Sequence, residues 1–528
     1  MGKRVFSLLT AMILIIIFAA SCGSRDADRR EDFASAVVDA EPAPTLVPEI
    51  TPSPVPTPEP EEPEPVAEII PITLQDALTR ANERREGVIK PDYNELLLMI
   101  EEYTLNLENI LRFIEPRQRV DTVLLNTAIA DVEDFFELLR DTYGGYVVLG
   151  GDAVFLPIRD AIIEEITTFG AGLGTTTLAR ILREHLLEVI ADAHFILDGH
   201  RFERDVFFYV STVAFDRTVS GFRNRETGLY AVMVDETPME YAVQLSLDEY
   251  GAFYYSLVIV RDYGLLYITS TILYTCGTIE EIRLNRLQAA TRIGFQPTSL
   301  EFINGVPIVT KRSMTFESNA QIHMTNTFLS FAEEVQDEPV VIVDLRSNGG
   351  GNGVLPYMWL YALTGEYIPS NNLSLGVNLF AGDLFHSTPA NNIFYQSEEN
   401  IQRFIPRKGL SDYFILMGGD PPDRIIEREQ LLIVLTDRHT ASAAEAFVDL
   451  AMNISNTLII GTNTGGVLNF SGSGFNTSML RSGIPFSFGP SAFIWPEGYL
   501  PESVGITPDI WVTGDALAAA LAMLRADI

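Results

Sequence analysis

Two buried-strand patterns, each running directly into a turn, constrain this chain more than any other feature. The first spans Val340–Gly353 and reads Val-Val-Ile-Val-Asp-Leu-Arg-Ser-Asn-Gly-Gly-Gly-Asn-Gly. The second spans Leu431–Glu445 and reads Leu-Leu-Ile-Val-Leu-Thr-Asp-Arg-His-Thr-Ala-Ser-Ala-Ala-Glu. A continuous apolar run of strand length is typical of a strand that is buried on both faces. Because such strands alternate with helical patterns from about Leu300 onward, we predict an α/β domain that continues toward the C-terminus.

Ser442 stands where the second turn enters a helix, since Ser442–Ile454 carries apolar residues at helical spacing. At such a place a hydroxyl group can be exposed, and the N–H of Ala443 has no acceptor within the helix. An acyl-transfer nucleophile needs an accessible oxygen of this kind with an N–H nearby for the developing oxyanion. A serine before a helix is more often an N-cap, so the local pattern alone does not decide between the two roles.

The glycine run Gly349–Gly351 follows the first strand. It fits neither G-x-x-x-x-G-K-[ST] nor G-x-G-x-x-G, and no lysine follows it, so the pattern does not favour a phosphate loop. Glycine lets the backbone approach a ligand closely. We therefore predict an oxyanion hole formed by the backbone N–H groups of Gly349 or Gly350 together with that of Ala443.

Residues 1–22 read as a lipoprotein signal peptide. Lys3 and Arg4 precede an apolar run, which ends in small residues directly before Cys22. The run is short for a membrane span, which needs about 20 apolar residues. We expect Cys22 to be lipidated and to become the mature N-terminus, and an uncleaved anchor is the alternative. With Cys276 as the only other cysteine, no internal disulfide and no cysteine-based metal site is expected.

The remainder of the chain divides by composition. Residues 23–72 are acidic and rich in proline, which predicts an extended, disordered spacer. Helical patterns dominate residues 73–200, a mostly β module follows over 201–299, and a C-terminal helix is expected over 516–528. The formal net charge of −35 makes nucleic acid an unsuitable partner, because phosphate binding needs a basic surface.

Four pieces together resemble the tail-specific, or C-terminal processing, serine peptidases, a family that includes the tricorn protease core. They occur in the order of that family, and each alone is a weak signal. The resemblance implies a crotonase-like α/β peptidase core over residues 300–515, with a polypeptide as substrate. The four pieces are Val343–Gly351, Thr440–Glu445, Gly461–Gly466 and Glu502–Ile510.

The identity of the general base follows from a departure from the family pattern. Many members use a lysine shortly after the T-x-G motif, where this chain has Gly466. The chain holds four lysines, all before Ser442, so a Ser–Lys dyad of that kind is excluded; they are Lys3, Lys90, Lys311 and Lys408. A serine hydroxyl without a base is a poor nucleophile at neutral pH.

Tricorn-like members use a histidine from the N-terminal part of the chain and a glutamate near the C-terminal Gly-x-x-Pro-Asp motif, and Glu502 matches that glutamate. For the histidine we favour His194, at an expected helix-to-strand junction, over His200. A serine precedes the histidine in tricorn, and here Ala193 stands in that position. A histidine base is expected to titrate near its unperturbed pKa of about 6.5.

The resemblance and the residues together predict a serine endopeptidase without metal or organic cofactor. Ser442 is expected to form an acyl-enzyme, His194 to act as base and Glu502 to orient the imidazole. The alternative is a catalytically degenerate peptide-binding lipoprotein on the same fold. Either protein is expected at the bacterial cell surface, attached by its lipid to the outer face of the cytoplasmic membrane.

Overall fold

The computed structural model describes most of the chain from residue 68 onward. The expected signal peptide with Cys22, and nearly all of the expected spacer, lie outside the described residues. No helix among the described residues has the length and apolar character to cross a membrane. The described residues are 68–88, 107–113, 115–288, 291–294, 298–315, 319–371, 373–377, 408–411, 425–472, 475–497, 499 and 502–526.

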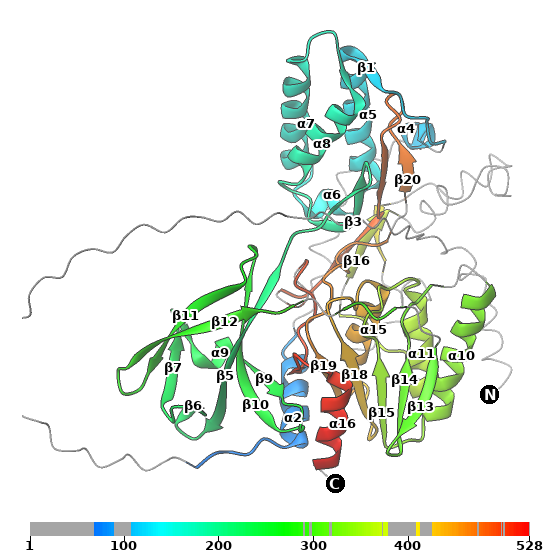
Figure 1. Ribbon diagram of the computed structural model, residues 1–528. Coiled ribbons are helices and arrows are strands. Elements are labelled where there is room, and N and C mark those ends of the chain that lie inside the picture. The colour runs from blue at the N-terminus through cyan, green and yellow to red at the C-terminus, as the bar shows by residue number, and fades with distance from the viewer. Residues whose placement is uncertain are drawn as a thin grey trace, which may run out of the picture.

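A parallel sheet forms the centre of the C-terminal half (Figure 1). The two strands predicted from the apolar runs are present with the expected limits, and they lie side by side as β15 (Val340–Asp344) and β18 (Leu431–Thr436). The carboxyl ends of both strands therefore meet at one edge of the sheet, which brings the two turns together. The other strands of this region are β13 (Ser299–Ile303), β14 (Val306–Thr310), β19 (Thr457–Gly461) and β23 (Ile510–Trp511).

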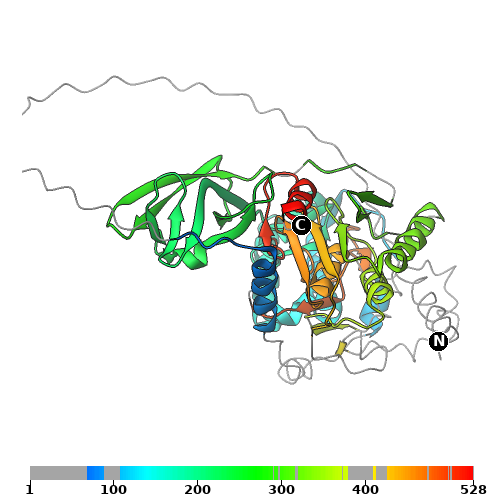
Figure 2. The ribbon, with the colours of Figure 1, turned by 90° about the horizontal axis from the view of Figure 1, so that it is seen from below.

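Helices cover both faces of this sheet, which explains why its strands lack an alternating polar pattern. Along β18, Leu432 and Val434 face one core, whereas Ile433 and Leu435 face the other. The first core packs against α10 (Asn319–Val335), α11 (Val354–Thr364) and α15 (Ala443–Ala451). The second packs against α2 (Leu74–Glu86) and α16 (Ala516–Ala526), which Figure 2 shows beside the sheet.

The mostly β module continues the same sheet, because Ser246 on β9 pairs with Trp511 on β23. Its strand β12 pairs with β5 as well as with β11, so β5, β6, β7, β11 and β12 close on themselves. The elements are β5 (Phe207–Thr218), β6 (Gly221–Asn224), β7 (Tyr230–Val234), β8 (Thr237–Pro238), α9 (Met239–Ala242), β9 (Val243–Leu247), β10 (Phe253–Arg261), β11 (Tyr267–Tyr274) and β12 (Ile279–Arg286).

A helical unit with its own core stands above the sheet in Figure 1. The Asp198-Gly199 pair forms the predicted hairpin turn with both φ angles positive, 53° and 79°. The unit consists of α4 (Leu107–Arg112), β1 (Thr122–Leu124), α5 (Leu125–Thr142), α6 (Gly145–Val148), α7 (Asp152–Thr167), β2 (Gly172–Gly174), α8 (Thr175–Leu186), β3 (Asp192–Leu197), β4 (His200–Phe202), β20 (Phe475–Ser478) and β21 (Pro485–Phe488).

Two elements pack in a different unit from the one that their position in the sequence predicts. The β20–β21 hairpin comes from the expected peptidase core, yet β21 pairs with β3 of the helical unit. The helix α2 belongs to the expected helical region, yet it packs on the central sheet. A separate three-stranded sheet contains β16 (Leu373–Val377), β17 (Lys408–Ser411) and β22 (Ser491–Ile494). The mixed α/β class, the helical N-terminal region and the β-rich middle are confirmed, while the crotonase-like detail stays a prediction.

Two neighbouring arginines fix α2 to the sheet. Arg85 pairs with Asp509 at 2.6 Å and donates to the carbonyl of Thr457 at 2.9 Å, with 2% of its side chain exposed. Arg84 pairs with the other oxygen of Asp509 at 2.6 Å, but 42% of its side chain is exposed. The same carboxylate therefore takes part in one buried and one solvated ion pair.

We predict that Arg85→Ala lowers the free energy of unfolding by about 3 kcal/mol, because it removes the buried ion pair of Asp509 and the guanidinium donor of the Thr457 carbonyl. Arg84→Ala is the matched control and should cost less than about 1 kcal/mol, since an exposed pair is screened by water. Urea denaturation of the two variants measures both values. Equal losses would contradict the distinction between the two pairs.

Candidate active site

Ser442 occupies a strained turn between β18 and α15. Its φ is 53° and its ψ is −119°, which is unusual for a residue with a side chain and costs on the order of 1–3 kcal/mol. Ser442 is half-buried, and it directly precedes the first helical residue, Ala443. The N–H of Ala443 has no acceptor within the helix and lies at the positive end of the helix dipole. A strained strand-to-helix turn of this kind is how a nucleophilic serine is presented in other hydrolases.

The carboxylate of Glu445 holds this turn in place. It is completely buried and accepts the N–H of Ser442 at 2.8 Å. It also accepts the hydroxyl of Thr464 at 2.6 Å and the N–H groups of Gly466 and Val467 at 2.7 and 3.0 Å. Burial raises the pKa of Glu445, and these four donors oppose that rise. Glu445 thus joins the serine turn to the turn after β19.

The first glycine turn lies directly against Ser442. Gly350 has a φ of 92°, and a Cβ atom on it would lie 2.6 Å from the carbonyl oxygen of Ala441 and 2.8 Å from the Cβ of Ser442. Only glycine permits this approach. The N–H of Ala441 donates to the carbonyl of Asn348 at 2.9 Å, which joins the two turns through their backbones.

Asp437 adds a second connection between these turns. It accepts the N–H of Ser347 at 2.9 and 3.0 Å and the N–H of His439 at 2.9 Å. Both turns are therefore held by one buried carboxylate that the sequence analysis did not single out. Its only sequence signal was its place at the end of β18, where polar residues of parallel sheets gather.

The three residues expected to form the oxyanion hole are placed differently from one another. Gly350 and Ala443 lie beside Ser442, as the 2.9 Å approach of a Gly350 Cβ to the Ala443 nitrogen indicates. The N–H of Gly350, however, already donates to the side chain of Asn348 at 3.0 Å. Gly349 is exposed, with the guanidinium of Arg292 beside it. The assignment of the oxyanion donors stays a prediction.

His194 lies on β3, at the helix-to-strand junction where it was expected. Its backbone N–H donates to Asp192 Oδ1 at 2.8 Å, and 16% of its side chain is exposed. Its Nδ1 atom is buried, has no hydrogen-bond partner and lies 4.0 Å from Asp192 Oδ1. The competitor, His200, is exposed on β4 beyond the hairpin turn.

The expectation of a titration near 6.5 is wrong for His194. Burial, together with the charge of Arg201, lowers its pKa to about 4, and the backbone of Phe470 opposes the shift. The imidazole is therefore neutral at neutral pH, which is the form that can accept a proton. The reason for the error is desolvation, which a sequence does not reveal.

Glu502 lies in the same region as His194, but the two side chains share no hydrogen bond. Both of its carboxyl oxygens are buried without a hydrogen-bond partner. Burial raises the pKa of Glu502 to about 9, and the charges of Asp192 and Glu445 raise it as well, while the N–H of Ala193 opposes them. Glu502 therefore interacts electrostatically with Asp192, two residues before His194, and with Glu445, which holds the Ser442 turn.

Arg438 attaches the segment of Glu502 to the serine turn. It precedes Ser442 by four residues and donates to the carbonyl groups of Ser503 and Val504 at 2.7 and 2.8 Å. The N–H of Ser503 donates to the carbonyl of Gly466 at 2.7 Å. These contacts hold the segment of Glu502 beside the Ser442 turn. They were not predicted from the sequence.

Gly466, which stands where the family resemblance implies a lysine, has no room for a side chain. Gly466 has a φ of 75°, and a Cβ atom on it would lie 2.6 Å from the nitrogen of Gly505 and 2.7 Å from the carbonyl carbon of Ser503. The backbone of the Glu502 segment occupies that space. Among the residues that the structure describes, no three His, Cys, Asp or Glu side chains form a group able to hold a metal ion.

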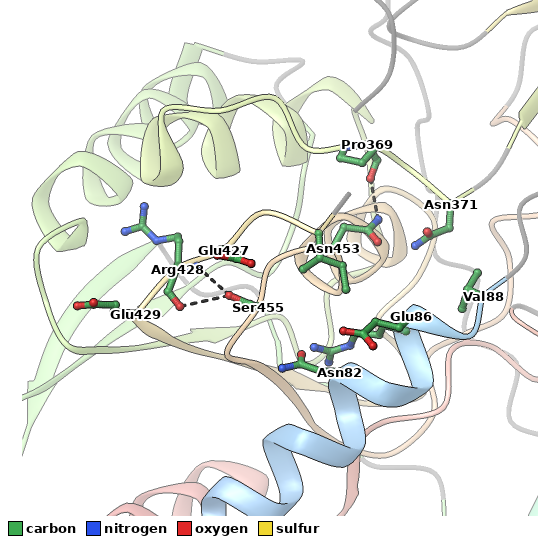
Figure 3. A pocket seen from close by; sticks show the side chains of 12 residues that line it. Asn82, Glu86, Val88, Pro369, Asn371, Glu427, Arg428, Glu429, Asn453 and Ser455 are labelled. Atoms are coloured by element: carbon green, nitrogen blue, oxygen red, sulfur yellow. Dashed lines mark hydrogen bonds between the residues drawn. The ribbon is translucent and has the colours of Figure 1, made fainter. Parts of the chain in front are cut away.

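A separate cavity of about 820 Å³ lies at the opposite ends of the parallel strands from Ser442, because its lining precedes β18 and β19. Figure 3 shows Asn453 donating to the carbonyl of Pro369, at 2.7 Å. The guanidinium of Arg428 is engaged by the carbonyls of Leu363 and Gln336. The lining residues are Asn82, Arg85, Glu86, Val88, Pro369, Asn371, Ile425, Glu427, Arg428, Glu429, Asn453 and Ser455.

Residues 394–512 match the family model described as peptidase family S41. The matched region contains Ser442 and Glu502, and it confirms the resemblance that the motifs indicated. No curated protein matches the chain.

Similar solved structures include mature CPAF complexed with lactacystin, the photosystem II D1 C-terminal processing protease and the tricorn protease. The first has 14% identity and a TM-score of 0.40, covering 76% of this chain and 98% of CPAF. The second has 13% identity and a TM-score of 0.33, covering 74% of this chain and 93% of the other. The third has 12% identity and a TM-score of 0.32, covering 76% of this chain and 37% of the tricorn protease chain. Likenesses at these scores decide nothing about the chemistry of this chain.

We predict that Gly350→Ala lowers the rate at which a fluorophosphonate labels Ser442 by about 10²-fold, since a displacement of the turn by about 1 Å has effects of that size. Gly365→Ala is the matched control. Gly365 has a similar φ of 74°, but no atom lies within 4 Å of the added carbon. Both variants carry the backbone strain, and only the first disturbs Ser442. Equal labelling of both would contradict the close contact.

Proposed function

We propose, from the premise that this chain is a serine-type peptidase of family S41, that it is an endopeptidase in which Ser442, His194 and Glu502 form the active site. The observation that carries the proposal is the Ser442 turn, strained at a φ of 53° and held by the buried carboxylate of Glu445. A fold seldom retains such strain without a functional reason. The substrate is a polypeptide, and no cofactor takes part in the reaction.

The proposed reaction proceeds through an acyl-enzyme. The Ser442 oxygen attacks the scissile carbonyl carbon while His194 accepts the hydroxyl proton. The tetrahedral oxyanion is held by backbone N–H groups, among which that of Ala443 has no helical acceptor. His194 then returns the proton to the leaving amine, and the acyl group stays on Ser442 as an ester. A water molecule, deprotonated by His194, hydrolyses that ester.

Burial of His194 supports its role as base, and it also requires a negative charge near the imidazole when that group becomes protonated. Its lowered pKa keeps the imidazole neutral and ready to accept a proton. The imidazolium formed in the transition state is then disfavoured by the same desolvation, unless a negative charge lies nearby. Asp192, whose Oδ1 lies 4.0 Å from Nδ1 of His194, is placed to meet this requirement when it is ionised.

A second candidate function is peptide binding without turnover, on a degenerate site. The observation that favours it is that Nδ1 of His194 and both carboxyl oxygens of Glu502 lack hydrogen bonds. Labelling by a fluorophosphonate distinguishes the two functions, because it requires an activated serine and not merely a bound peptide. A protein that binds peptides but takes up no label at Ser442 is the degenerate one.

We further propose that the protein is attached to the bacterial cell surface by a lipid on Cys22. Small residues precede this cysteine and an apolar run precedes them. The acidic and proline-rich residues 23–72 would then separate the peptidase from the outer face of the cytoplasmic membrane.

We predict that Ser442→Ala abolishes cleavage of an unfolded protein substrate and leaves the thermal midpoint nearly unchanged. His194→Ala should lose as much activity, and the double variant little more, because residues that act as one catalytic unit are not additive. Single-turnover assays on the three variants measure these losses. Activity above about a tenth of wild type in Ser442→Ala would exclude it as the nucleophile.

His200→Ala is the matched control for the base. His200 lies six residues from His194, beyond the hairpin turn, and is exposed, so its loss should leave activity near that of wild type. If His200→Ala were inactive and His194→Ala active, the base would be His200.

We predict that Cys22→Ser releases the protein from membranes or leaves its signal peptide uncleaved, because the lipid attaches to the thiol. Membrane fractionation and the mass of the mature protein measure the outcome. Cys276→Ser, which changes an exposed cysteine of the β module, is the control and should fractionate as wild type does. Unaltered fractionation and mass in Cys22→Ser would remove the lipoprotein interpretation.

A further inference from the structure

The carboxylate of Asp192 lies at the start of β3, two residues before His194, and it is completely buried. One oxygen accepts the backbone N–H of His194 at 2.8 Å, and the other accepts the hydroxyl of Tyr143 at 3.1 Å. Neither the family pattern nor the sequence motifs assigned a function to this residue. The backbone N–H of Phe195 interacts with it as well. A completely buried carboxylate two positions before the base needs a reason to be retained.

Tyr143 holds Asp192 from the opposite side and is itself fixed. It directly follows α5 and its ring packs against Phe195, Phe470 and Phe488, with ring centroids 5.2, 5.9 and 5.5 Å away. The next residue, Gly144, donates its N–H to the carbonyl of Gly489 at 3.1 Å. The hydroxyl of Tyr143 therefore reaches Asp192 from a rigid aromatic cluster.

The Nδ1 atom of His194 faces this carboxylate across a short gap. It is buried, has no hydrogen-bond partner and lies 4.0 Å from Asp192 Oδ1. A shift of about 1 Å closes the gap to hydrogen-bonding distance, and catalytic hydrogen bonds are often long before substrate binds. The carboxyl oxygens of Glu502, in contrast, form no hydrogen bond with the imidazole.

We propose that Asp192, held by Tyr143, is the positioning residue for His194, and that Glu502 acts behind it. Ionised Asp192 accepts a hydrogen bond from Nδ1–H, so that Nε2 is the nitrogen that takes the proton of Ser442. The negative charge of Asp192 then balances the imidazolium that forms. In this chain Asp192 thereby provides the support that Ala193, next to it, cannot give. The proposal rests on the proposed peptidase function and specifies one part of its site.

The surrounding charges fit this division of roles. The groups that act on Asp192 and His194 are Tyr143 from the end of α5, Arg201 from β4 and the carboxyl of Glu502. The charges of Glu445 and Glu203 act in turn on Glu502. Burial raises the pKa of Asp192 to about 7 and that of Glu502 to about 9. Near neutral pH the proton therefore stays on Glu502, and Asp192 is the group that ionises as the pH rises. An ionised Asp192 in turn favours the protonated form of His194.

The test compares Asp192→Asn with Glu502→Gln, each a replacement of nearly the same shape. Asp192→Asn should lower the single-turnover rate by about 10²- to 10⁴-fold, as expected when a base loses its orienting carboxylate. In wild type the rate should rise with pH through about 7, as Asp192 ionises. That rise should be absent in Asp192→Asn. Glu502→Gln should lose less activity and keep the rise, because Glu502 acts in its neutral form.

The control for loss of a buried carboxylate is Asp131→Asn. Asp131 is buried in the same helical unit and accepts the N–H groups of Arg481 and Ser482 at 2.9 and 2.6 Å. Its replacement should lower the thermal midpoint and leave the pH profile of wild type intact. A purely structural function of Asp192 would give this same pattern, and that result would overturn the proposal.

Two other outcomes also decide the proposal. A loss in Glu502→Gln greater than that in Asp192→Asn assigns the positioning to Glu502 and overturns it. If Asp192→Asn fails to fold, Tyr143→Phe replaces it, since this change removes only the hydroxyl that donates to Asp192. A rise of the single-turnover rate that is displaced to higher pH supports the proposal. An unchanged rise of the rate overturns it. Wild-type protein that takes up no fluorophosphonate label would instead overturn the peptidase function itself.

Discussion

The buried carboxylate of Glu445 is the interaction on which the rest of the site depends. Its four donors come from the serine turn and from the turn after β19, so a single side chain sets the spacing of both. A carboxylate with this many donors is worth burying, whereas one without them costs several kcal/mol. The strain at Ser442 is retained because this group, and Gly350 on the other side, leave the backbone no alternative.

Carboxyl groups are unusually concentrated around the candidate base. Asp192 and Glu445 each interact electrostatically with Glu502, and burial raises the pKa values of all three carboxyl groups. The net charge of −35 does not cause this, since most of that charge is solvated and screened. What matters is the local arrangement, in which each group either accepts hydrogen bonds or keeps its proton. Such pairs, whose environments separate their pKa values, are typical of acid–base sites.

The fold places these groups by bringing together four distant parts of the chain. The parallel order of β15 and β18 carries the glycine turn and the serine turn to one edge of the sheet. The hairpin of β20 and β21 leaves the core and pairs with β3, which fixes the strand of His194 against the peptidase half. Arg438 then holds the Glu502 segment through backbone carbonyl groups. Carbonyl groups give no sequence signal, because every residue has one.

The sequence by itself determined the elements that depend on local chemistry. The apolar runs set the limits of β15 and β18, the Asp198-Gly199 pair set the hairpin after β3, and the absence of lysine after Ser442 excluded one kind of base. Only the tertiary structure decided which groups meet. It lowered the pKa of His194 by burial, placed Asp192 rather than Glu502 nearest its Nδ1, and filled the space beside Gly466 with backbone. Desolvation and distance depend on segments far apart in the chain, and no local pattern of residues contains them.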